Sequence, residues 1–173
     1  MPSSAPQVRI EPMQEADMAC VLAVQAQCYT AIVPESAQSL RAKLLAAPQS
    51  CFVARRGAAM VGYLVALPLR WPELPALDSP DCLLPAQPDT LYLHDLALAA
   101  PARGSGAGRA LVDAALAQAA LWRLPQAALV AIQDSARYWQ ALGFRALAAQ
   151  GQPLQAKLAS YGAGAVLMRK ELL

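Results

Sequence analysis

The sequence has little of what a disordered chain, a membrane span or a nucleic-acid-binding surface requires. Only 15% of its 173 residues are charged and 57% are hydrophobic, whereas disordered chains combine low hydrophobicity with high net charge. No apolar run reaches the roughly 18–20 residues that a membrane-spanning helix needs. The formal net charge is +2, and no cluster of Lys and Arg marks a phosphate-binding face. We therefore expect a globular protein that binds neither nucleic acid nor a membrane.

The residues of a metal site are also scarce. The chain has one histidine and four cysteines, and no two cysteines form a Cys-x-x-Cys pair. We therefore expect neither a zinc site nor any other metal site. Residues 1–6 lack the charged and apolar regions of a secretory signal, so we expect a cytoplasmic protein with free thiols.

The spacing of apolar residues predicts a mixed α/β fold. Apolar residues recur at helical spacing from Glu15 to Tyr29, and Ser36 is a candidate N-cap for a second helix that ends before Pro48. Further helices are expected over residues 106–122 and about 135–142. Strands are expected over residues 8–10, 51–54, 60–66, 90–98, 127–132, 144–147 and 165–170, with a hairpin turn at 55–58. This order of elements fits a single mixed sheet with helices on its faces.

A glycine-rich segment connects the strand that ends at Leu98 to the next helix. It has the sequence Arg103-Gly104-Ser105-Gly106-Ala107-Gly108. Glycines allow a backbone to approach a ligand closely because they have no Cβ. The first N–H groups of a helix have no partner within the helix and lie at the positive end of its dipole, so they bind phosphate or pyrophosphate. We therefore predict a phosphate-binding site here, to which Arg103 and Arg109 add positive charge.

The spacing of the glycines separates the families that use such a segment. A dinucleotide-binding fingerprint would require a third glycine where Arg109 stands, and a Walker A loop would end in Gly-Lys-Ser/Thr. Both departures count against a nucleotide-binding α/β protein. An ordinary strand-to-helix turn is the structural alternative, although three glycines in one turn cost conformational entropy.

The pattern Arg-x-x-Gly-x-Gly, which begins five residues after the apolar strand residue Leu98, resembles the Gcn5-related N-acetyltransferase (GNAT) superfamily. In that superfamily the run binds the pyrophosphate of coenzyme A. Residues 134–144, which end in Leu-Gly-Phe, are similar to a later helix of the family, and the segments 158–162 and 165–170 resemble its closing strands. The resemblance extends over roughly residues 8–171.

The resemblance implies a single N-acetyltransferase domain of a bacterial type over residues 1–173. Its fold would be a mostly antiparallel, twisted sheet of six to seven strands, splayed at the cofactor site and flanked by about four helices. The protein would transfer acetyl from acetyl-CoA directly to a primary amine of a small molecule or of a peptide or protein. A non-catalytic acyl-CoA-binding module is the alternative, and a homodimer is compatible with the sequence. The expected cofactor contacts are Leu96, Ala97, Leu98, Arg103, Gly104, Ser105, Gly106, Ala107, Gly108, Arg109, Asp134, Ser135, Tyr138 and Trp139.

Two neighbouring residues are candidates for the general base of such a reaction. An alkyl amine with a pKa near about 10.4 is mostly protonated at neutral pH, so a base must remove a proton before the amine attacks. His94 stands where the spermidine/diamine acetyltransferases have a glutamate that is assigned as the base, and Asp95 is the second candidate. Adjacent strand residues point to opposite faces, so we do not expect the two side chains to share a pocket. A structural role for His94 at a sheet face is the alternative.

The proton donor departs from the family pattern. In much of the family a tyrosine stands four residues before the glycine of Leu-Gly-Phe, but here that residue is Trp139, whose indole cannot act as a general acid. Tyr138 is the catalytic candidate, yet it lies about 100° away around the helix and is expected to face elsewhere unless the register shifts. A packing role for Tyr138 is an equal alternative. If neither Tyr138 nor Tyr161 reaches the sulfur, water protonates the thiolate.

The proline-rich segment 68–88 is predicted to be a long irregular loop, because prolines interrupt strand pairing throughout it. Loops of this length in a compact domain are usually functional or disordered. Four of its side chains are candidates to contact a cationic or aromatic amine: Trp71, Glu73, Asp78 and Asp81. A solvated loop whose acidic residues maintain solubility is the alternative, and a dimer-facing role for Trp71 stays open.

Overall fold

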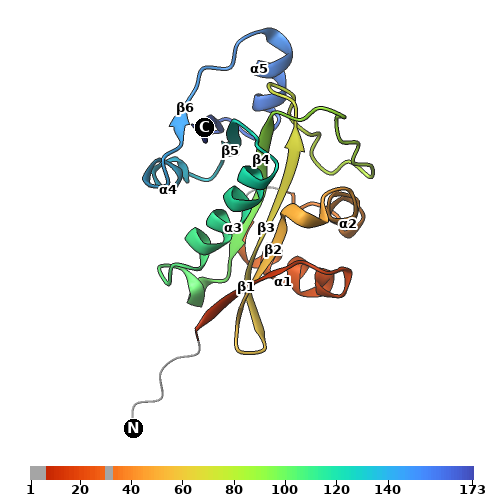
Figure 1. Ribbon diagram of the computed structural model, residues 1–173, viewed down its shortest axis with the longest axis vertical. Helices are drawn as coiled ribbons and strands as arrows, with labels where there is room; N and C mark the ends of the chain where they lie inside the picture. Colours follow the sequence, from red (N-terminus) through yellow and green to blue (C-terminus); the bar gives the residue numbers. More distant parts are fainter. Residues whose placement is uncertain (1–6, 30–32) are drawn as a thin grey trace.

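The computed structural model describes residues 7–29 and 33–173 and has a seven-stranded sheet at its centre (Figure 1). The strands lie in the order β1-β2-β3-β4-β5-β7-β6. Their bounds are β1 Val8–Pro12, β2 Cys51–Arg56, β3 Ala59–Leu69, β4 Thr90–Leu98, β5 Gln126–Ala131, β6 Arg145–Ala146 and β7 Val166–Glu171. The α-helices are α1 Met18–Cys28, α2 Ala37–Ala46, α3 Ala107–Leu121, α4 Ala136–Ala141 and α5 Gln152–Ala159. Three short 3-10 helices are η1 Glu15–Asp17, η2 Pro48–Ser50 and η3 Ala100–Ala102.

Helices cover both faces of the sheet, with α1 and α2 on one side and α3 on the other (Figure 1). Neighbouring residues of the central strands face opposite layers, as the strand period of two requires. Val53 and Tyr63 pack in the layer of α1 and α2, whereas Ala54 and Leu64 pack in the layer of α3. The apolar positions that predicted these elements are therefore buried on both sides of one sheet.

The two strands at the centre of the sheet separate along their length. β4 and β5 form the only parallel pair of the described sheet, and their pairing is limited to Thr90–Tyr92 against Gln126–Ala128. β4 nevertheless continues to Leu98 and β5 to Ala131. The strands therefore diverge beyond Tyr92, which confirms the predicted splayed and mostly antiparallel sheet.

A β-bulge interrupts β4 on its other edge, where it pairs with β3. Val65 pairs with Asp95 and the next residue, Ala66, pairs with Leu93, so His94 is the extra residue. A bulge places two successive residues opposite one and re-aims the side chains that follow. This irregularity determines where His94 and Asp95 point.

Several predicted boundaries were correct, and others were wrong. Ser36 caps α2 as expected, because its Oγ accepts a hydrogen bond of 3.2 Å from the amide of Ser39. Pro68 lies inside β3 rather than in a loop; β2 pairs with β3 only as far as Val65, so the missing N–H of Pro68 faces no neighbouring strand. The irregular connection accordingly spans residues 70–89, which we call the β3–β4 loop.

The C-terminal part of the chain differs from the prediction in its helices and strands. Residues 158–162 were expected in a closing strand, but Leu158 and Ala159 end helix α5 and residues 160–162 form a turn. Helix α5 was not predicted, although Pro153 stands in its first turn, a position that favours helix initiation. The predicted strand 144–147 is reduced to the two residues of β6.

No helix among the described residues has the length and apolar character that crossing a membrane requires.

Candidate active site

A cavity of about 440 Å³ lies where β4 and β5 diverge. Many of the expected cofactor contacts line it: Leu96, Ala97, Leu98, Arg103, Gly104, Ser135, Tyr138 and Trp139. The remaining ones do not line this cavity and lie around the start of α3 or, in one case, before α4: Ser105, Gly106, Ala107, Gly108, Arg109 and Asp134. The lining also includes His94, the first candidate base, and residues that were not predicted for the site: Cys28, Tyr29, Leu93, Leu129, Val130, Ile132 and Gln133. We call this space the first cavity.

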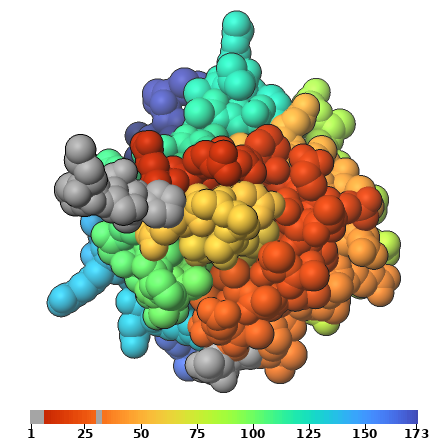
Figure 2. Space-filling model, turned by 90° about the horizontal axis from the view of Figure 1, so that it is seen from below, coloured from red at the N-terminus to blue at the C-terminus, as the bar shows by residue number. Residues whose placement is uncertain are grey.

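The glycine-rich run leads from the 3-10 helix η3 into α3 and is exposed. Gly104 and Gly106 have φ values of +75° and +85°, in the left-handed region that favours glycine. Among the described residues, the amides of Gly104, Gly106, Gly108 and Arg109 have no hydrogen-bond acceptor. Figure 2 shows the green segment that leads into α3 at the surface, next to the yellow β2–β3 hairpin. The run therefore offers free N–H groups at the positive end of a 15-residue helix, as a phosphate site requires.

Tyr138 and Trp139, neighbours in α4, differ in exposure. Tyr138 lines the first cavity and is 39% exposed, so the prediction that it faces elsewhere was wrong. Burial of the side chain raises the pKa of Tyr138, so its hydroxyl stays protonated at neutral pH. Trp139 is buried, and its ring packs edge-on against Phe144 with 5.5 Å between centroids. The helix is only six residues long and follows two residues with positive φ, Gln133 and Asp134, which set its orientation.

A second cavity, of about 380 Å³, lies beside β4 and the end of α1. It is lined by residues from five segments: Gln25, Tyr29, Val33, Pro34, Glu35, Leu77, Asp78, His94, Asp95, Ser160, Tyr161 and Gly162. Two residues, Tyr29 and His94, line both cavities. They therefore lie between the two spaces, where a group bound in one would meet a group bound in the other.

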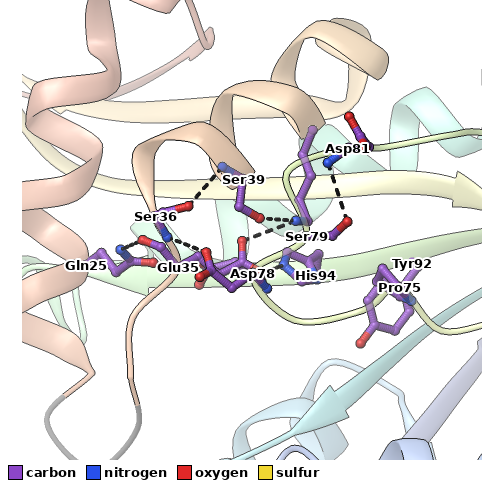
Figure 3. A network of polar contacts seen from close by, with 12 residues as sticks. Gln25, Glu35, Ser36, Ser39, Pro75, Asp78, Ser79, Asp81, Tyr92 and His94 are labelled. Carbon is purple, nitrogen blue, oxygen red and sulfur yellow. Dashed lines mark hydrogen bonds and ion pairs between the residues drawn. The ribbon is translucent and has the colours of Figure 1, made fainter.

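His94 belongs to a buried network of polar contacts that no motif in the sequence indicated. Its Nε2 lies 2.8 Å from Oε1 of Glu35, and Oε2 of Glu35 lies 3.4 Å from Nζ of Lys43. Lys43 also donates a 2.7 Å hydrogen bond to Ser39 Oγ within α2. Figure 3 shows Glu35, Asp78 and His94 meeting from three separate elements. Glu35 belongs to no recognisable sequence motif, and it lies near His94 only in the folded chain.

The ionisation of Glu35 follows from these contacts. Burial by itself raises the pKa of Glu35, but the hydrogen bond and charge of His94, the charge of Lys43 and the amide of Asp78 lower it to about 2. Asp78 in turn accepts a 2.7 Å hydrogen bond from the amide of Ser36, which lowers the pKa of Asp78. This contact joins the β3–β4 loop to the start of α2.

Asp95 lies in a different network, although it shares the second cavity with His94. Its two carboxylate oxygens accept hydrogen bonds from Tyr29 (2.5 Å) and Tyr63 (2.6 Å). Burial raises the pKa of Asp95, and the two tyrosines act in the opposite direction. The expectation that His94 and Asp95 point to opposite faces was wrong, because the bulge at His94 breaks the alternation.

Tyr161 lies on the wall of the second cavity, not the first. Its hydroxyl donates a 3.0 Å hydrogen bond to the carbonyl of Pro75 and lies 3.3 Å from the hydroxyl of Tyr92. Burial raises the pKa of Tyr161 to about 12. The residue therefore ties the segment after α5 to the β3–β4 loop. Within residues 7–29 and 33–173, no group of three or more His, Cys, Asp or Glu side chains is placed to hold a metal ion.

Solved structures share this arrangement of elements. The loading GNATL domain of CurA from Lyngbya majuscula is 12% identical, with a TM-score of 0.78 and coverage of 96% of this chain and 98% of that one. Ard1 from Thermoplasma volcanium is 17% identical, with a TM-score of 0.73 over 96% and 98% of the two chains. Arabidopsis thaliana Naa50, in complex with the bisubstrate analogue CoA-Ac-MVNAL, is 13% identical, with a TM-score of 0.67 over 94% and 97%. At these identities the likeness shows the fold alone.

Sequence comparison identifies the family. No curated protein matches the chain. A family model described as the acetyltransferase (GNAT) family matches residues 18–144, a range that includes the glycine-rich run, both candidate bases and the Leu-Gly-Phe segment. Taken together with the splayed sheet and the cavity beside the start of α3, this match shows that the chain belongs to the acetyltransferase (GNAT) family.

Proposed function

We propose that the protein transfers the acetyl group of acetyl-CoA directly to a primary amine of a small molecule or a peptide. One observation carries this proposal: Tyr29 and His94 separate a cavity beside the glycine-rich run from a second cavity lined by carboxylates. Acetyl-CoA occupies the first cavity and the amine occupies the second. The thioester carbonyl and the amine nitrogen then meet beside His94.

The start of α3 holds the pyrophosphate of coenzyme A. The free amides of the glycine-rich run donate to its oxygens, and Arg103 and Arg109, both exposed, add charge. The pantetheine arm lies in the split between β4 and β5, where the facing strand edges are unpaired. A backbone N–H near Leu98 holds the thioester oxygen as negative charge develops on it.

His94 acts as the general base. The protonated amine gives a proton to His94, and its nitrogen then attacks the carbonyl carbon. As the carbon–sulfur bond breaks, the attacking nitrogen loses its second proton to water. The coenzyme A thiolate takes a proton from Tyr138, which water then reprotonates, or directly from water. The products are an N-acetylated amine and coenzyme A, with no acyl-enzyme between them.

His94 is favoured over Asp95 because of their hydrogen-bond partners. Both oxygens of Asp95 already accept a hydrogen bond from a tyrosine hydroxyl. His94 has a ring nitrogen, Nδ1, without a partner among the described residues. Asp95 therefore supports the wall of the site by fixing Tyr29.

The second cavity suits an amine with an apolar part. Glu35, Asp78 and Asp95 give it negative character, while Val33, Pro34 and Leu77 provide apolar surface. Naa50 was crystallised with a peptide-linked analogue of coenzyme A, which supports a peptide amine as one acceptor class. A non-catalytic acyl-CoA-binding module is the alternative, because Trp139 occupies the usual donor position and is buried.

Calorimetry with acetyl-CoA, using ATP and NAD as controls, tests the first half of the proposal. Thiol release in the same preparation tests the second half, with spermidine, phenethylamine and a tetrapeptide with a free N-terminus as acceptors. We expect selective binding of acetyl-CoA and thiol release with at least one amine. Selective binding without release on any amine would favour the binding module, and the absence of coenzyme A binding would overturn the proposal.

A further inference from the structure

We propose that Glu35, held in place by Lys43, is a positioning residue that directs the Nδ1 lone pair of His94 at the acceptor amine. This inference rests on the proposed function and deepens it. Glu35 belongs to none of the motifs in the sequence, and it lies 59 residues before His94. It enters the site from the segment that precedes α2, whereas His94 enters from the bulge of β4.

The side chains of His94, Glu35 and Lys43 form a continuous chain of contacts in the protein interior. The side chains of His94, Glu35 and Lys43 are 3%, 10% and 2% exposed. The distances along this chain of contacts are 2.8 Å from His94 to Glu35 and 3.4 Å from Glu35 to Lys43. Buried charges persist in proteins when they are paired, as Glu35 and Lys43 are here.

The ionised state of Glu35 determines which nitrogen of His94 carries the proton. Burial alone would raise the pKa of Glu35, but His94, Lys43 and the amide of Asp78 lower it to about 2, so it is a carboxylate wherever an amine acetyltransferase operates. A carboxylate only accepts hydrogen bonds, so Nε2 of His94 must carry the hydrogen that lies between them. In the neutral ring the lone pair is then on Nδ1.

The surroundings of Nδ1 of His94 also indicate that a ligand binds there. Nδ1 is fully buried and has no hydrogen-bond partner among the described residues. Buried nitrogens without partners are rare in native proteins, and each one needs an explanation. His94 lines both cavities, so a proton donated by the amine nitrogen or by a bound water satisfies this atom.

Polar and charged groups lie around His94 on several sides. When Nδ1 takes a proton, the ring becomes a cation that faces the carboxylate of Glu35. The other polar groups near it come from elements on every side: Asp95 and Tyr92 on β4, Tyr29 at the end of α1, Asp78 in the β3–β4 loop and Tyr161 before β7. Lys43 lies 3.4 Å from the second oxygen of Glu35 and offsets its charge, although that oxygen has no hydrogen-bond partner among the described residues.

The Glu35→Gln variant tests this role because it keeps the shape and removes the charge. We expect kcat to fall by about tenfold or more, with the calorimetric affinity for acetyl-CoA changed by less than twofold. Glu35→Asp should recover part of the loss. A matched control is Glu15→Gln, which removes an exposed ion pair to Arg41 of α2 (3.1 Å) and should leave kcat unchanged. Turnover of Glu35→Gln equal to that of the unmodified protein would overturn the inference.

A second measurement needs neither a variant nor an acceptor. Because the chain has one histidine, nitrogen-15 NMR of the ring reports the tautomer of His94 directly. We expect the neutral form of the ring to carry its hydrogen on Nε2, with that hydrogen protected from exchange with water. A ring protonated at Nδ1 would overturn the inference even if Glu35→Gln fails to fold.

The His94→Gln variant separates the two proposals. If it keeps full turnover, the base assigned under the proposed function is wrong. If it loses turnover while Glu35→Gln keeps it, the proposed base stands and only the inference on Glu35 fails.

Discussion

The hydroxyl of Tyr138 lies 2.5 Å from the position that a Cβ on Gly108 would occupy. Gly108 stands in the first turn of α3, and Tyr138 reaches across from α4 to lie on it. The contact joins the wall of the first cavity to the helix start that we propose to bind pyrophosphate. It also explains the third glycine of the run, which has no positive φ.

Gly108→Ala should therefore displace Tyr138. The added methyl would also lie 2.9 Å from a methyl of Leu98, but both neighbours are side-chain ends that move more cheaply than backbone. We expect acetyl-CoA affinity to fall several-fold in calorimetry, with a small change in thermal stability. Unchanged affinity would show that the position of Tyr138 does not matter for cofactor binding.

Tyr138→Phe tests the hydroxyl without moving the ring. If Tyr138 protonates the leaving thiolate, kcat should fall by roughly tenfold, within the usual range for general acid catalysis, and acetyl-CoA affinity should stay within about twofold. Thiol release at saturating acetyl-CoA is the measurement. An unchanged kcat would assign the proton to water.

Gly106→Glu should abolish acetyl-CoA binding. The side chain would place bulk and negative charge beside the free amides, in a backbone with φ of +85° that costs about 1–2 kcal/mol for a residue with a Cβ. Gly57→Glu is the matched control, because Gly57 in the β2–β3 turn also has a positive φ, +64°, and open space around it. Calorimetry on both variants separates the backbone cost from the electrostatic one. If Gly106→Glu binds acetyl-CoA as tightly as Gly57→Glu does, the pyrophosphate does not bind at the start of α3.

Asp95→Asn should lower stability more than it lowers turnover per folded molecule. The amide has one acceptor oxygen where the carboxylate has two, so one of the two tyrosine hydroxyls, Tyr29 or Tyr63, can no longer donate to this side chain. That loss costs about 1–3 kcal/mol of unfolding free energy, which urea denaturation measures. A stable variant without turnover would instead mean that Asp95 takes part in the chemistry.

Glu35 also predicts how stability changes in acid. Its pKa is about 2 in the folded protein against 4.5 as the ordinary value, so the folded state keeps a charge that the unfolded chain neutralises first. This contribution is therefore complete above about pH 4.5 and is lost as the pH falls toward 2. Urea denaturation at about pH 5.5 and pH 3 gives the unfolding free energy that each variant loses between these two pH values. We expect this loss to be roughly 1–2 kcal/mol smaller in Glu35→Gln than in Glu15→Gln. Equal losses would mean that Glu35 is not selectively ionised in the fold.

The sequence predicted those features that depend on local chemistry. The glycines of the run, the cap at Ser36 and the helix that ends at Gly143 each have a conformational reason that a short segment carries. The family resemblance supplied the splay of the sheet. The assigned roles of the cofactor contacts and of His94 stay predictions.

Features that depend on contacts between distant segments were missed. The bulge at His94 depends on pairing with β3, so simple alternation misplaced His94 relative to Asp95. The pairing of Glu35 with His94 exists only because the start of α2 packs beside β4. The orientation of Tyr138 depends on two positive-φ residues before α4, and neither of them is glycine.

The short pairing of β4 with β5 has a mechanical consequence. Only three residues of each strand connect the part of the sheet that contains β1–β4 to the part that contains β5–β7. A ligand in the first cavity contacts both parts and so holds β4 and β5 together where they do not pair. Occupancy should therefore slow amide hydrogen exchange in β5 as well as β4, and the melting temperature should rise with acetyl-CoA concentration as for any ligand that binds only the folded state. In this protein the bound cofactor would connect the two parts of the sheet where the strands do not pair.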